Sequence, residues 1–145
     1  AQDYIDRYNA RYPKILGFMQ RMIEEARETG RAVTLFGRYR ELPDIRSKNF
    51  MRRSLAERMA MNTPIQGTAA DIMKMAMIAV YDKLRKDRYK SRVLLQVHDE
   101  LVAEVTLEEK EEIAALLKET MESVVTLKVP LLADVNEGKN WAETK

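Results

Sequence analysis

A short polar group, His98-Asp99-Glu100, lies between two apolar stretches of the chain. Residues 93–97 and 101–105 are rich in branched side chains and have the length of buried strands. A two-residue His-Asp connection would join them as a tight antiparallel hairpin, although neither residue is typical of such turns. The strands would hold two carboxylates and an imidazole at the tip, which is a suitable place for a metal ligand. These residues alone leave a solvated turn open as the alternative.

The composition limits which metal such a site would bind. The chain has no Cys and one His, so disulfides and cysteine-ligated zinc are excluded. A metal would be held mainly by carboxylate oxygens, which suits magnesium or manganese. No stretch approaches the roughly 18 apolar residues of a membrane span, and no secretion signal is visible. We therefore expect a cytoplasmic protein with no membrane partner.

Charge is spread unevenly along the 145 residues, whose net charge is +2. Residues 30–58 contain eight basic and three acidic side chains, a net charge of +5. Residues 96–145 contain twelve acidic side chains and five lysines, a net charge of −7. This asymmetry suggests one face for a polyanion and another for solvent or cations, and a solvated charge pattern without a partner stays open as the alternative.

The first part of the chain is predicted to form helices and a small hairpin. Residues 2–11 predict a helix that begins without a cap, which suggests that the chain starts at a cut end. A second helix is predicted from Pro13 to a stop at Gly30. Two short strands are predicted at 32–36 and 39–42.

The next helix is expected to be capped by Ser47 or Asn49 and to reach about Asn62. Pro64 should interrupt the helical pattern, so that a later helix restarts with Thr63 as its cap. That later helix is expected to run to about residue 84. Its predicted core-facing residues are Ile65, Ala69, Ile72, Ala76 and Val80.

Arg58, Asn62 and Gln66 recur every four residues, which would give a polar line on one helix face if the helix continues. Further along, Thr106 and Glu109 have the spacing of a capping box. The helix that they open would turn Ile113, Leu117, Thr120 and Val124 inward. Residues 130–135 predict a last strand. This order of elements predicts an α+β fold, with an antiparallel sheet and a tight hairpin backed and flanked by helices.

Three segments identify a family. They are Thr34-Leu35-Phe36-Gly37-Arg38 with Leu42-Pro43-Asp44, the ungapped stretch from Glu57 to Asp71, and Gln96-Val97-His98-Asp99-Glu100-Leu101. Through them the whole chain resembles the C-terminal part of the polymerase domain of family A DNA polymerases, the bacterial DNA polymerase I type. The resemblance implies a palm-type sheet, with residues 1–145 as a single fragment of that domain, comprising palm and adjoining helices.

The resemblance also implies that the parent enzyme is a DNA-directed DNA polymerase of replication and repair. It would transfer nucleotides from dNTPs to a primer 3′-end in template-directed synthesis. The implied partners are primer-template DNA, a dNTP and the missing N-terminal portion of the polymerase domain. The implied cofactor is Mg2+ in a two-metal site. This chain would supply only part of that site, because the family's two other polymerase motifs are not in the sequence.

At the hairpin, the resemblance assigns a role to each polar residue. Asp99 matches the aspartate that binds the catalytic magnesium ions, and a pair of hard cations needs anionic oxygens. Glu100 matches the adjacent glutamate, which lies beside the catalytic site. His98 matches a histidine beside the primer 3′-end, where an imidazole can donate to a phosphate or sugar oxygen.

Gln66 matches a glutamine that contacts the minor groove at the primer terminus, with Arg58 and Asn62 as its neighbours. The minor groove presents acceptors at every base pair, so donors there can sense pair shape without reading sequence. A hydrogen-bond network that only fixes the fold is the alternative for Gln66 and His98. Packing or capping is the alternative for Arg58 and Asn62. Four arginines would meet either DNA phosphates or solvent: Arg38, Arg40, Arg52 and Arg53.

From the missing motifs we expect that this chain folds but does not polymerise alone. The competing interpretation is a non-catalytic DNA-binding module in which the basic face binds duplex DNA and the hairpin tip is only a turn. The substitution Asp99→Asn separates the two, because a pure binder would tolerate it. A weaker third interpretation is a structural fragment that only its missing partner segments stabilise.

Overall fold

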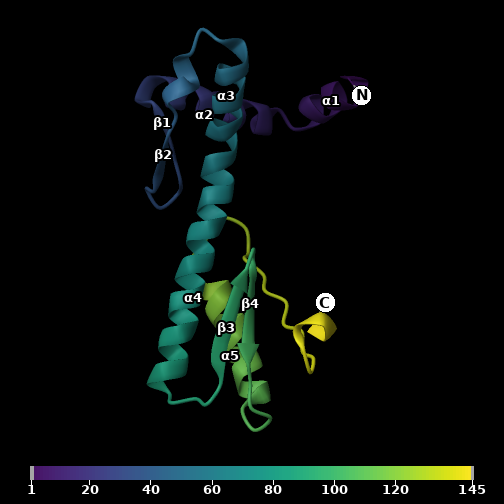
Figure 1. Ribbon diagram of the computed structural model, residues 1–145. Coiled ribbons are helices and arrows are strands. Elements are labelled where there is room, and N and C mark those ends of the chain that lie inside the picture. Colours follow the sequence, from purple (N-terminus) through teal and green to yellow (C-terminus); the bar gives the residue numbers. More distant parts are fainter. Residues whose placement is uncertain (1, 145) are drawn as a thin grey trace. The chain divides into compact units, whose positions relative to one another are not determined.

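The computed structural model describes residues 2–144 and has an α+β structure, as the sequence predicts (Figure 1). Its strands form two separate two-stranded antiparallel sheets. The chain divides into two compact units, with the boundary after Thr68. Within residues 2–144, no helix has the length and apolarity that crossing a membrane requires.

The first unit begins with two helices, α1 (Gln2–Arg11) and α2 (Pro13–Thr29). Pro13 stands in the first turn of α2, where its missing N–H costs no helical hydrogen bond. Gly30 ends α2 in the left-handed conformation, with φ 77°, and its N–H donates to the C=O of Ala26. Both predicted helices are confirmed, with their proline start and glycine stop.

A short hairpin follows, formed by β1 (Arg31–Val33) and β2 (Tyr39–Glu41). These strands are shorter than predicted because the residues between them form a hydrogen-bonded turn. In this turn the Thr34 N–H donates to the Arg38 C=O at 2.8 Å, and the Gly37 N–H donates to the Thr34 C=O at 3.0 Å. Gly37 has φ 83°, which glycine adopts without steric cost.

A 3-10 turn, η1 (Pro43–Arg46), leads to α3 (Phe50–Asn62). Asn49 caps α3, because its side-chain oxygen accepts the N–H groups of the second and third residues after it, at 3.0 and 3.2 Å. Of the two predicted caps, Asn49 is therefore the right one. The buried core of this unit comes from α2, β1, η1 and α3 and consists of Ala26, Ala32, Leu42, Ile45, Ala56 and Ala60.

After α3, residues Thr63–Gly67 form a π-helical turn, η2. Thr63 has helical backbone angles, φ −58° and ψ −45°, so the expectation that it caps a new helix is wrong. Proline lacks an N–H, and in an α-helix its ring clashes with the carbonyl four residues earlier. Here the chain accommodates Pro64 in a π turn, whose hydrogen bonds span five residues, and the helical backbone does not stop.

Helix α4 (Thr68–Lys86), which belongs to the second unit from Ala69 onward, buries Met73, Ala76, Val80 and Leu84. Ala76 and Val80 were predicted to face the core and do so. Ile65 and Ala69 were predicted to face it too, but both are exposed, Ile65 by 58%. Ile65 lies in the π turn, which does not keep the 3.6-residue spacing of an α-helix, so an apolar line that starts at Ile65 does not stay on one face.

The predicted tight hairpin is present as β3 (Arg92–Val97) and β4 (Glu100–Glu104). Each strand begins one residue before its predicted start. The structure pairs Val97 with Glu100, so His98 and Asp99 are the two connecting residues, as predicted.

A β-bulge interrupts this hairpin at Leu94. Val93 pairs with Ala103 and Leu95 pairs with Val102, which leaves Leu94 as an additional residue on β3. Because side chains alternate along a strand, the additional residue puts Leu95 on the face opposite Val93. The bulge therefore lets Val93 pack into the core while Leu94 and Leu95 are about half exposed, by 50% and 48%.

Helix α5 (Lys110–Ser123) covers the same face of the hairpin as α4 (Figure 1). Val80, Leu84 and Ile113 are its buried centre, and Val93 and Leu101 of the hairpin pack against them. Ile113 and Thr120 are buried as predicted. This packing fixes the strands on which the polar tip is built.

Two predictions for the C-terminal part are wrong. Thr106 does not form a capping box with Glu109, because its N–H donates to Ser91 Oγ at 3.2 Å and α5 has no side-chain cap. Residues 130–135 form no strand. The N–H of Ala133 donates to the Glu122 side chain at 3.0 Å, so a carboxylate takes the place of a neighbouring strand. A 3-10 turn, η3 (Trp141–Thr144), ends the described chain.

Candidate functional site

The connection of the β3–β4 hairpin has an unusual backbone. His98 has φ 53°, in the left-handed region that residues other than glycine seldom adopt. Both favoured two-residue hairpin turns require a positive φ at the first connecting residue, which explains this conformation. A left-handed histidine in place of Asn or Gly costs some backbone energy, and such residues concentrate at functional sites.

The three tip residues, His98, Asp99 and Glu100, are exposed. Below them, Gln96 Nε2 donates to the backbone C=O of His98 at 2.5 Å. This bond ties the left-handed residue back to its own strand. The tip therefore combines accessible side chains with a backbone that the hairpin holds in place.

The donor set at the tip suits magnesium in part. Mg2+ prefers oxygen ligands and is commonly bound through one or two carboxylates, with water and substrate phosphates completing its octahedron. Asp99 and Glu100 are exposed carboxylates on adjacent residues. Residues 2–144 contain no cluster of three or more His, Asp or Glu side chains that would hold a metal ion by itself. The tip fits a shared site to which this hairpin contributes carboxylates.

A hydrogen-bond network closes the base of the same hairpin. The Glu109 carboxylate accepts the N–H of Lys90 at 2.9 Å, the N–H of Ser91 at 2.9 Å and the hydroxyl of Ser91 at 2.6 Å. Ser91 Oγ in turn accepts the N–H of Thr106. Ser91 precedes β3 and Thr106 follows β4, so this network joins both ends of the hairpin to the start of α5.

These donors also set the ionisation of the carboxylate. The N–H of Lys90, followed by the Ser91 hydroxyl, lowers the pKa of Glu109 below its ordinary 4.5, because hydrogen bonds to the charged form favour it. Nearby, the Tyr89 hydroxyl donates to Glu112, which raises the pKa of Tyr89 from 10.0 to about 12. Both groups lie at the base of the hairpin and stabilise it from the α5 side.

The predicted polar line lies in the first unit. Arg58 and Asn62 are exposed residues one turn apart on α3, and Gln66 is an exposed residue of the π turn. Hydrogen bonds in a π turn span five residues, so Gln66, four residues after Asn62, lies less than a full turn from it. The structure brings Arg58 and Asn62 onto one face as predicted and rotates Gln66 away from a strict line.

The tip of the β1–β2 hairpin contacts this π turn. Arg38 Nη2 donates to the Gly67 C=O at 2.9 Å, and the Leu35 N–H donates to Thr68 Oγ1 at 2.9 Å. Thr68 Oγ1 donates to the Pro64 C=O. No local pattern in the sequence indicates which residues make this contact.

Several arginines that were candidates for DNA phosphate contacts bind the protein itself. Arg38 bonds the π turn, as described above. Arg53 Nη1 donates to the Ser47 C=O at 2.8 Å, and Arg52 lies 3.6 Å from the Asp44 carboxylate. Arg40 is exposed on β2. Three of these four arginines therefore have partners within the chain.

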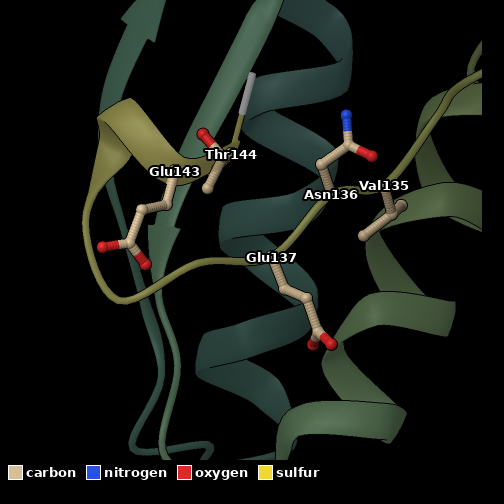
Figure 2. A pocket seen from close by; sticks show the side chains of 5 residues that line it. All are labelled: Val135, Asn136, Glu137, Glu143 and Thr144. Carbon is tan, nitrogen blue, oxygen red and sulfur yellow. The ribbon is translucent and has the colours of Figure 1, made fainter.

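A shallow cavity at the C-terminal tail contains none of the predicted site residues. Its lining consists of Val135, Asn136, Glu137, Glu143 and Thr144 (Figure 2). Both carboxylates are engaged within the chain, Glu137 with Lys110 at 2.7 Å and Glu143 with Asn140 Nδ2 at 2.6 Å. This cavity does not contribute to the candidate site.

Comparison with known proteins agrees with the polymerase-type features of the chain. The sequence matches the family described as DNA polymerase family A over residues 1–143. It is 50% identical to DNA polymerase I of Caldicellulosiruptor bescii and 52% identical to DNA polymerase I of Streptococcus pneumoniae serotype 4, over all 145 residues in both cases. The chain spans 17% and 16% of the length of these two relatives.

A solved structure is similar over almost the whole chain. It is the POL domain of Pol1 from M. smegmatis in complex with DNA primer-template and dNTP, with 39% sequence identity and a TM-score of 0.96. The match covers 99% of this chain and 25% of that one. By sequence and by structure, the chain belongs to DNA polymerase family A.

Proposed function

We propose that this chain is the C-terminal part of the polymerase domain of a DNA-directed DNA polymerase. The complete enzyme would catalyse template-directed addition of nucleotides from dNTPs to a primer 3′-end. The observation that carries this proposal is the exposed Asp99 at the tip of a tight hairpin, in a chain that matches the polymerase family over residues 1–143. The related Pol1 domain was solved with primer-template and dNTP, which supports the same partners here.

In this proposal Asp99 is the metal ligand of the chain, and Glu100 lies beside it as the second catalytic carboxylate. When bound there, Mg2+ would offset negative charge on the phosphoryl group being transferred. A metal that takes only one or two carboxylates from this hairpin needs further ligands, which the missing N-terminal portion of the polymerase domain and the substrate phosphates would supply. The chain alone would then be inactive.

The remaining residues would hold the primer. His98 can donate an N–H to a phosphate or sugar oxygen near the 3′-end, because its side chain is exposed beside Asp99. Gln66 would donate its amide N–H groups to the minor-groove acceptors of the terminal base pair, with Arg58 and Asn62 as donors on the adjacent turn. All three of these side chains are exposed. Such contacts sense the shape of any correct base pair, as copying an arbitrary template requires.

The test is the substitution Asp99→Asn in the complete polymerase that contains this chain. The amide keeps the size of the side chain but weakens its affinity for Mg2+. We expect nucleotide addition to fall on the order of 10²-fold or more, with primer-template affinity unchanged within about twofold. The measurements are single-nucleotide incorporation and fluorescence anisotropy with a labelled duplex.

Glu104→Gln is the matched control, because it removes a carboxylate at the other end of β4. Glu104 forms an exposed ion pair with Arg92 at 2.8 Å, and such pairs contribute little. The Glu104→Gln polymerase should retain both nucleotide incorporation and primer-template binding. Full incorporation by Asp99→Asn would reject the catalytic role and leave the non-catalytic DNA-binding module as the better description. The structural role found for Arg38 and Arg53 weakens that alternative at present.

A further inference from the structure

We infer that the β1–β2 turn is a clamp that positions Gln66, with Thr34 and Arg38 as positioning residues and Gly67 as the residue that they grip. The inference rests on the proposed contact between Gln66 and the primer terminus. It concerns residues to which that proposal gives no role. The clamp consists of Thr34, Leu35 and Arg38 together with their contacts to the π turn.

The first contact is a charged hydrogen bond to the π-turn backbone. Arg38 Nη2 donates to the C=O of Gly67, the residue that directly follows Gln66, at 2.9 Å. Hydrogen bonds from a charged donor are about twice as strong as neutral ones. The Arg38 guanidinium therefore binds a main-chain carbonyl, although it was expected to meet solvent or DNA phosphate.

The second contact is a hydroxyl bridge. Thr68 Oγ1 accepts the Leu35 N–H at 2.9 Å and donates to the C=O of Pro64. A threonine that bonds the carbonyl four residues earlier bends a helix locally. This bridge links the clamp to the beginning of the same turn, so Gln66 lies between two anchored points, Pro64 and Gly67.

The third contact is steric. A Cβ atom at Gly67 would lie 2.6 Å from Thr34 Cγ2. Non-bonded carbons prefer separations of about 3.5–4.0 Å, so any side chain here would push the turn and the helix apart. Thr34 is only 6% exposed, so its methyl group has little room to move. Close packing of the turn on the π backbone thus requires glycine at position 67.

Together these contacts fix the backbone on both sides of Gln66 while its own side chain is exposed. An amide that senses base-pair shape needs such a support, because a displacement of about 1 Å can cost on the order of 10²-fold in rate. A π turn without these contacts would not hold the backbone of Gln66 in a fixed position. The clamp would act on the match-mismatch discrimination of the enzyme through Gln66, without touching DNA.

The test measures extension of matched and mismatched primer termini by the complete polymerase, with kcat and KM separated. Gly67→Ala introduces the clash, and Arg38→Ala removes the charged bond. We expect each to lower the ratio of matched to mismatched extension about tenfold, toward the ratio given by Gln66→Ala. Glu41→Ala, at an exposed residue of β2 beside the clamp, is the control and should keep the ratio of the unaltered enzyme.

A paired variant separates positioning from simple loss of stability. Thr34→Ser removes the methyl group that the new Cβ would strike and keeps the hydroxyl. The double variant Thr34→Ser with Gly67→Ala should therefore regain most of the discrimination that Gly67→Ala loses. Lower melting temperatures with an unchanged discrimination ratio in Arg38→Ala and Gly67→Ala would overturn the inference, because they would show a purely structural role.

The Gln66→Ala variant distinguishes failure of the clamp from failure of the proposed primer contact of Gln66. If it loses discrimination while Arg38→Ala and Gly67→Ala keep it, the clamp is rejected and the primer contact stands. If Gln66→Ala itself keeps full discrimination, the proposed contact of Gln66 fails, and the clamp loses its function with it.

Discussion

The Glu109 carboxylate binds both the backbone N–H and the hydroxyl of Ser91, at 2.9 and 2.6 Å. This pair joins the residue before β3 to the residue before α5. The Glu109 carboxylate thus lies at the base of the hairpin whose tip carries the proposed metal ligand. These hydrogen bonds favour the ionised carboxylate and lower the pKa of Glu109, so the stability of this region depends on pH.

The first prediction concerns that dependence. Because the folded state lowers the pKa of Glu109 below 4.5, the charged form contributes stability above that value, and the contribution is lost as pH falls through the folded pKa. Glu109→Gln should therefore lower the free energy of unfolding at neutral pH and differ progressively less from the unaltered protein in acid. Urea unfolding across this range measures it. Glu108→Gln, an exposed neighbour paired with Lys90 at 3.6 Å, should show no such trend.

A second prediction uses the hydrogen bond from Tyr89 to Glu112. This hydrogen bond raises the pKa of Tyr89 from 10.0 to about 12. The stability that the bond contributes is therefore fully present below pH 10.0 and is lost as the pH rises toward 12. In an absorbance titration, a tyrosine should ionise near pH 12, and Tyr89→Phe should abolish that step. Retention of the step in Tyr89→Phe would contradict the assignment. Tyr81→Phe is the control that should leave it in place.

A third prediction concerns the core under the hairpin. Ile113 is fully buried against Val80 and Leu84. Ile113→Ala should destabilise the protein by about 2–5 kcal/mol, through lost burial and the cavity that remains. Leu107→Ala, at a residue that is 91% exposed, should change stability by less than about 0.5 kcal/mol. Equal effects of the two variants in urea unfolding would show that this core is not the one that holds the hairpin.

A fourth prediction concerns the chain by itself. If the tip supplies only part of a metal site, Mg2+ should cause weak NMR shifts confined to His98, Asp99 and Glu100, and a primer-template duplex should strengthen them. The same 145-residue chain should extend no primer. Primer extension by the chain alone would show that the site is complete without further segments, contrary to the proposal.

Local patterns were enough to predict the helices, their proline start and glycine stop, and the tight hairpin. They succeeded because each depends on neighbouring residues. Gly30 takes a left-handed conformation at the end of α2, and the branched runs on either side of His98-Asp99 form strands of the expected length. The predicted tip is exposed for the same reason, since a two-residue connection leaves its side chains outside the ladder.

The failures arose where a distant residue decided the outcome. Glu109 has the spacing to accept the Thr106 N–H, but the hydroxyl of Ser91, 15 residues before Thr106, accepts it instead. Residues 130–135 have the composition of a strand, yet Glu122 receives the Ala133 N–H and the structure pairs no strand with them.

The prediction also failed at the π turn, where residues distant in the sequence make contacts. Arg38 lies 29 residues from Gly67, and Leu35 lies 33 residues from Thr68. No periodicity counted along one helix contains these contacts. A helix that reaches a proline can either stop or continue through a π turn. Here it continues, and the β1–β2 hairpin contacts the π turn.

The bulge at Leu94 has a consequence for protein engineering. Because β3 carries one more residue than β4 between Val93 and the tip, Val97 and Val93 lie on opposite faces of the hairpin. Transplanting only His98-Asp99-Glu100 onto a regular hairpin would present the carboxylates on the wrong side relative to a supporting core. The smallest portable unit is the whole of residues 91–106, with the bulge included. The three-residue tip proposed to bind metal is in this sense a sixteen-residue part.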